Sequence, residues 1–122
     1  MERKYSPLPE YSNEEIEAIL QREDPNELAL LSLSVGQFHP HWKTAQDLCA
    51  KLSEHPDPRV RANAVLGLAY IARTKRKLEK HIVKPIVLRE LKQNREYEWR
   101  IRDAISDING YMGWRIGRKP NV

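Results

Sequence analysis

The chain has 122 residues, of which 40% are hydrophobic and 31% charged, a length and composition that fit a single globular domain. Its one cysteine excludes an internal disulfide and favours a reducing compartment. No apolar run is long enough to cross a membrane, and the N-terminus lacks the apolar segment of a secretory signal. We therefore expect a cytoplasmic protein that does not associate with a membrane.

The charge is divided unevenly along the chain, whose formal net charge is +4. Residues 1–61 carry 7 Lys and Arg against 11 Asp and Glu, a balance of −4, whereas residues 62–122 carry 14 against 6, a balance of +8. Such an asymmetry is typical of a protein that meets charged partners, and it arises equally from two solvated faces. The acidic residues between Glu10 and Glu27 could cover a basic site on a partner or simply form a solvated first helix.

Helical periodicity dominates the sequence, glycine is scarce and strand-type alternation is nearly absent, which predicts an all-α protein. Residues 1–11, which include Pro7 and Pro9, are expected to form an extended N-terminal arm. Residues 12–113 are interpreted as a single helical domain, and residues 114–122 as a loose, basic C-terminal tail.

Six helices are predicted inside this domain. Ser12 begins a capping box, and Asp24-Pro25 and Asp57-Pro58 each combine an N-cap residue with a first-turn proline. We expect Gly36 to cap the end of the second helix, and Pro85 to kink the fifth or mark its late start. The approximate bounds are 12–22, 26–35, 42–54, 58–73, 79–93 and 96–112.

The fourth helix is expected to be the most buried. The ten residues from Ala64 to Arg73 include one charge, and apolar side chains lie on most of the helix circumference. A helix of this kind must be covered on several sides, so we interpret it as the centre of the domain.

A weak internal repeat links this helix to the sixth. Aligning Ala64 on Ala104 gives a spacing of 40 residues, close to the period of HEAT-type arrays. The segment DPRVRANAVLGLAYIA resembles the second helix of a HEAT repeat, with an Asp, then Val-Arg, then a small residue and spaced aliphatic residues. A proline inside the first helix of a repeat, as at Pro85, is also familiar in HEAT proteins. The resemblance implies a short α-solenoid of three antiparallel helical hairpins.

The resemblance also suggests where a partner would bind. Second helices of stacked hairpins line the concave side of a solenoid, and a polar stripe with Leu66 runs along the fourth helix. An alternative is that Leu66 and Tyr70 pack on the next hairpin while the arginines pair with Asp103 or Asp107. A second candidate patch surrounds a tryptophan of the sixth helix, since Trp, Tyr and Arg are typical of binding hot spots. The predicted partner-binding residues are Arg59, Asn63, Tyr70, Arg73, Trp99, Arg102 and Asp103.

Catalytic and metal-binding patterns are weak. His39 and His41 supply two imidazoles, fewer than the three or four ligands of a zinc site. Cys49 falls on the inward stripe of its helix and is interpreted as a core residue. Asp103 and Asp107 share one helical face, but a ladder of ion pairs with Arg100 explains them more simply than acid–base catalysis. We therefore predict no metal, no cofactor and no enzymatic activity.

Two functions follow from these observations. The size and helical layout are similar to those of bacterial immunity proteins, which implies a non-enzymatic module that binds and occludes a cognate toxin, as a monomer or weak dimer. The alternative is a nucleic-acid-binding protein that contacts phosphates through its basic second half, where Arg73 to Lys84 hold six cations. Trp114 could cap the open end of the core or dock a second subunit.

Overall fold

A computed structural model describes residues 7–118, and within that range the chain is all-helical, with no strand. Residues 1–6 of the predicted arm and 119–122 of the predicted tail lie outside the described residues. The elements are α1 (Asn13–Arg22), α2 (Pro25–Phe38), α3 (Trp42–Leu52), α4 (Pro58–Lys75), α5 (Lys80–Gln93), the short 3-10 helix η1 (Arg95–Tyr97) and α6 (Glu98–Met112).

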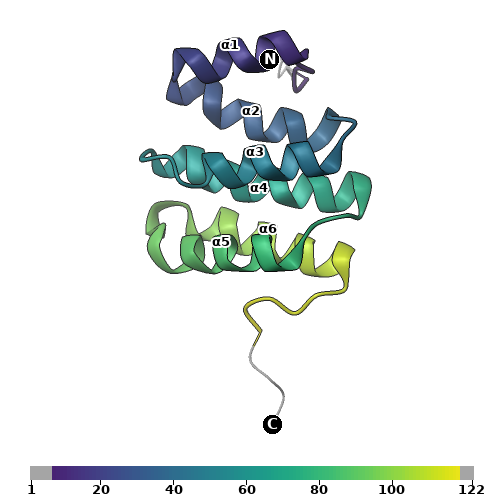
Figure 1. The fold of residues 1–122 in the computed structure, drawn as a ribbon. Coiled ribbons are helices and arrows are strands. Elements are labelled where there is room, and N and C mark those ends of the chain that lie inside the picture. The colour runs from purple at the N-terminus through teal and green to yellow at the C-terminus, as the bar shows by residue number, and fades with distance from the viewer. Residues whose placement is uncertain (1–6, 119–122) are drawn as a thin grey trace, which may run out of the picture.

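The helices are stacked in chain order. In Figure 1, α1 and α2 lie at one end, α3 and α4 in the middle, and α5 and α6 at the other end. Helix α4 packs most extensively against α2 and α6 and also contacts α3 and α5. Ten of its residues are buried, which confirms the prediction that it is the centre of the domain.

The helix starts follow the local sequence. The Ser12 hydroxyl accepts a hydrogen bond from the Glu15 backbone N–H at 3.1 Å, and the Glu15 carboxylate accepts one from the Ser12 N–H at 3.0 Å. Asp24 and Asp57 cap α2 and α4, each followed by a proline in the first turn. These contacts join neighbours in the sequence, which is why the residue pattern predicts them.

The end of α2 differs from the prediction. Helix α2 continues through Gly36 to Phe38, so Gly36 is not a C-terminal cap. It is buried against α4, where a Cβ on Gly36 would overlap the carbonyl oxygen of Gly67. A Cβ on Gly67 would in turn lie 2.6 Å from the Ser32 carbonyl oxygen and 2.8 Å from the Cys49 sulfur. The two glycines let the backbones of α2 and α4 approach closely.

Residues 114–118 pack onto the helical domain and do not form the loose tail that was expected. The Ile116 side chain is 2% exposed. Its backbone N–H donates to Asn109 Oδ1 and its carbonyl oxygen accepts from Asn109 Nδ2, both at 2.9 Å. Trp114 packs against the same core, so it caps the end of the domain that α5 and α6 form.

A buried ion-pair network holds α4 and α5 together on the side of the molecule where His55 lies. Glu90 is 1% exposed, and its carboxylate accepts from Arg61 at 3.0 Å and from Arg89 at 3.1 Å. Arg89 also donates to the carbonyl oxygen of Ser53 at 2.7 Å. The two arginines, together with the side-chain amide of Asn94 that donates to Glu90 Oε1 at 3.2 Å, therefore satisfy the buried carboxylate, as a buried charge requires.

Candidate partner-binding surface

The polar stripe predicted on α4 joins three helices. The buried side chain of Asn63 donates to the Ala29 carbonyl oxygen of α2 at 2.9 Å and accepts from Arg100 of α6 at 2.7 Å. Arg59 donates to the side-chain oxygen of Asn26 in α2. The amide of Asn63 therefore links α4 to both α2 and α6. Because the residue is 8% exposed, it leaves little surface for a partner.

Tyr70 and Arg73 lie further along the same stripe. The Arg73 guanidinium lies over the Tyr70 ring, 4.6 Å from its centre, and donates to the side chain of Gln37 in α2. Within residues 7–118 neither Arg59 nor Arg73 pairs with Asp103 or Asp107, so the alternative arginine–aspartate pairing is wrong.

The second predicted patch lies on α6. Trp99 is 81% exposed, and Arg102 pairs with Glu98 one turn earlier at 3.0 Å. The predicted ladder on Arg100 is wrong, because Arg100 reaches Asn63 and lies 5.2 Å from the centre of the Tyr97 ring. Asp103 is exposed and makes no ion pair in the part of the chain that the structure describes. The seven predicted residues are thus divided between an α4 group that largely bonds to its neighbours and an exposed α6 group.

A hollow of about 680 Å³ lies beside Tyr70 and Arg73, and sequence reasoning did not find it. Its apolar walls include Leu8 of the N-terminal segment, Leu30 in the middle of α2 and Phe38 at its end. Because it brings residue 8 next to residue 70, no local pattern could reveal it. Phe38 is 37% exposed, which places an aromatic side chain at the solvent-facing side of the hollow.

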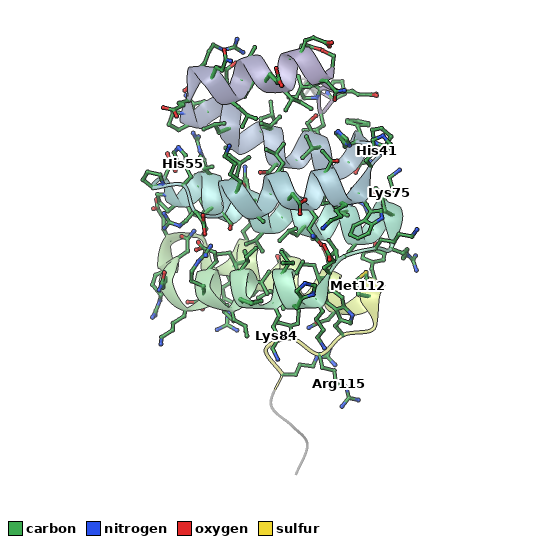
Figure 2. All side chains as sticks on the ribbon, viewed as in Figure 1. His41, His55, Lys75, Lys84, Met112 and Arg115 are labelled. Carbon is green, nitrogen blue, oxygen red and sulfur yellow. The ribbon has the colours of Figure 1, made fainter. Side chains whose placement is uncertain are left out.

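A basic edge follows the hollow, at the C-terminal end of α4 and the N-terminal half of α5. In Figure 2, Lys75 lies at the side of the molecule opposite His55, and Lys84 lies toward the end that α5 and α6 form. All six cations are exposed, and none forms an ion pair within the described range 7–118. We define the basic edge by these residues: Arg73, Lys75, Arg76, Lys77, Lys80 and Lys84.

Three of these cations lie over aromatic rings. Besides Arg73 over Tyr70, the Arg76 guanidinium is 5.1 Å from the centre of the Tyr111 ring, and Lys80 Nζ is 5.7 Å from the centre of the Trp114 ring. Attraction to the face of an aromatic ring restricts the orientations of a long side chain without neutralising its charge. The basic edge therefore presents partly ordered positive charges.

Glu79 is the carboxylate that interrupts the basic run, and it binds to α3. Its Oε1 accepts from Lys43 at 2.6 Å and from Gln46 at 2.9 Å, and its backbone N–H donates to Gln46 Oε1 at 2.7 Å. The hydrogen bond from Lys43, followed by that from Gln46, lowers the pKa of Glu79 below 4.5. We call these contacts of Glu79 with Lys43 and Gln46 the Glu79 clasp. They fix the start of α5 and direct the carboxylate toward α3.

The remaining candidates for chemistry are Cys49 and the pair His39 and His41. Cys49 is 0% exposed, and burial raises the pKa of its thiol to about 12, so it is a core residue as predicted. Burial also lowers the pKa of His39, whose Nδ1 accepts from the His41 backbone N–H at 3.1 Å. Among residues 7–118 no three His, Cys, Asp or Glu side chains gather where they could hold a metal ion. No described helix is long and apolar enough to span a bilayer.

Known proteins share this all-helical architecture. The chain is similar to one in the crystal structure of a CDI complex from Cupriavidus taiwanensis LMG 19424, with a TM-score of 0.75 over 90% of this chain and 98% of that chain. The two sequences are 20% identical, so the likeness shows a common fold. No protein-family model matches the sequence, and no curated protein matches it either.

Proposed function

We propose that this chain is a non-enzymatic, immunity-type protein that binds a toxin domain and occludes it. The observation that carries the proposal is the structural likeness to a chain of a CDI complex, which extends over nearly the whole of both chains. CDI denotes contact-dependent inhibition, in which a toxin is paired with an immunity protein. A whole-domain match to one member of such a complex favours binding to a protein.

The same proposal includes a HEAT-like α-solenoid of three antiparallel hairpins. It is supported by the contacts of α4 with both α2 and α6, since second helices of stacked hairpins touch one another. Ala64, Val65 and Leu68 are buried, and so are Ala104, Ile105 and Ile108 at the predicted spacing of 40 residues. In such an array, the stripe on α4 faces the concave side.

The proposed mechanism is occlusion of the toxin through this side and the adjacent α6 patch. Trp99 supplies a large exposed aromatic surface, while Tyr70 and Arg73 lie beside the hollow. Residues of these types contribute most of the binding energy in many interfaces. The opposed charges of the two halves of the chain would steer the encounter and fix its orientation. The protein would act in the cytoplasm, as a monomer or weak dimer.

Co-expression with candidate toxin domains, taken first from any toxin gene that neighbours this one, tests the proposal. We expect wild-type protein to restore growth and to co-elute with the toxin domain in size-exclusion chromatography. Trp99→Ala should weaken the complex by about 2 kcal/mol or more if this side chain is a hot spot. Lys92→Ala, which changes another exposed residue, is the matched control. The proposal is refuted if the toxin domain neither binds nor is neutralised.

The nucleic-acid alternative is favoured by one observation, the six unpaired cations of the basic edge within the described residues. Purification with and without nuclease, followed by binding at increasing salt, distinguishes it. A nucleic-acid ligand would lose affinity with a slope of about 0.9 per neutralised phosphate in a plot of log affinity against log salt. Stable co-elution with a toxin domain after nuclease treatment would instead support the immunity proposal.

A further inference from the structure

We propose that the hollow and the basic edge together form the docking site for a segment of a protein partner in which an apolar side chain is followed by carboxylates. This inference rests on the proposed function, because it assigns the chemistry of the bound partner. The hollow would receive the apolar side chain, and Arg73 and Arg76 would bind the carboxylates that follow it.

Charge complementarity supports an acidic occupant. The six cations of the basic edge have no ion-pair partner in the described range, and Glu79, the nearest carboxylate in the sequence, is engaged by Lys43 and Gln46. The arginine fork matches a carboxylate with two parallel hydrogen bonds. The face of Tyr70 already orients Arg73, and the face of Tyr111 orients Arg76. Binding would therefore cost these two side chains less conformational entropy than it would cost two freely moving arginines.

The hollow supports an apolar anchor next to those carboxylates. Leu8, Leu30 and Phe38 line it, and Arg73 lies at the same hollow. Its volume of about 680 Å³ is large enough to admit an aliphatic or aromatic side chain. Arg73 belongs both to the hollow and to the basic edge, so the anchor and the first carboxylate of the partner segment would be neighbours.

The same features disfavour a nucleic acid at this site. Single-stranded nucleic acids combine phosphate contacts with bases stacked on exposed aromatic rings. Here Arg73, Arg76 and Lys80 cover the faces of Tyr70, Tyr111 and Trp114, the rings that would have to stack.

Fluorescence anisotropy of the full chain with labelled peptides tests the site. The first peptide, Leu-Phe-Asp-Glu-Asp-Glu, carries the anchor, and the second, Gly-Ser-Asp-Glu-Asp-Glu, has the same charge without it. We expect the first to bind about tenfold more tightly, because its apolar side chains leave water. Phe38→Ser should remove most of that difference, and Arg76→Glu should weaken both peptides. Lys92→Glu is the matched control, since it changes the charge equally on α5 near its C-terminal end.

Three results would overturn the inference: equal affinities for the two peptides, tighter binding of a single-stranded oligouridylate than of either peptide, or equal losses with Lys92→Glu and Arg76→Glu. Circular dichroism of each variant shows whether it is folded. If the double variant Phe38→Ser, Arg76→Glu is folded and neutralises the toxin domain as well as wild type does, this inference fails while the proposed function stands. If the peptides bind as expected but no toxin is neutralised, the proposed function fails instead.

Discussion

The close approach of α2 and α4 makes Gly67→Ala the sharpest test of the structure. Gly67 lies inside α4, where alanine is ordinarily favoured over glycine by about 1 kcal/mol. The added Cβ would lie 2.6 Å from the backbone oxygen of Ser32 and 2.8 Å from the Cys49 sulfur. A backbone oxygen cannot rotate away as the end of a side chain can, so the two helices must separate.

Overpacking of this kind typically costs about 1–3 kcal/mol, and contact with backbone places Gly67→Ala at the upper end of that range. Subtracting the gain in helix propensity of about 1 kcal/mol leaves a net loss of about 2 kcal/mol. For a domain of this size the midpoint of thermal unfolding should fall by about 8 °C.

Gly110→Ala is the matched control, because Gly110 lies inside α6 and its added Cβ would meet no atom within 4 Å. This variant should gain only the higher helix propensity of alanine, about 1 kcal/mol of stability. Its midpoint of thermal unfolding should rise by about 4 °C. Thermal and urea unfolding followed by circular dichroism at 222 nm, a wavelength that reports helix content, measure both variants. If Gly67→Ala were as stable as wild type, the argument that Gly67 permits the α2–α4 contact would be refuted.

Three further outcomes are expected. Cys49 should resist alkylation by iodoacetamide in the native protein and react only on unfolding, because its thiol is buried and its pKa is raised to about 12; rapid native labelling detected by mass spectrometry would contradict this. Ile116→Ala should cost about 2 kcal/mol in urea unfolding, whereas Arg118→Ala, an exposed neighbour, should cost little; equal values would show that residues 114–118 do not pack as described. The hydrogen bonds that lower the pKa of Glu79 stabilise the folded state above pH 4.5, and this contribution is lost as the pH falls below 4.5 through the folded pKa. The stability difference between wild type and Glu79→Gln should therefore shrink below pH 4.5, and a difference independent of pH would exclude the Glu79 clasp.

The candidate site was predicted in part. The sequence pattern singled out Tyr70 and Arg73 from their stripe on α4, and Trp99 from its position outside the inward stripe of α6, and their role in binding stays a prediction. The partners of the stripe could not be predicted, because Asn63 bonds to Ala29 and Arg100, residues 34 and 37 positions away in the sequence. The hollow was missed for the same reason, since it brings Leu8 of the N-terminal segment beside α4.

The sequence by itself determined where α1, α2 and α4 begin, because their capping residues Ser12, Asp24 and Asp57 bond to backbone groups two or three residues away. It also determined that α4 is central, since a helix that is apolar around most of its circumference has to be covered on several sides. Only the tertiary structure decided the role of Gly36. A glycine near a helix end is typical of a cap, and the backbone of α4, brought alongside by folding, turns it into a point of close contact.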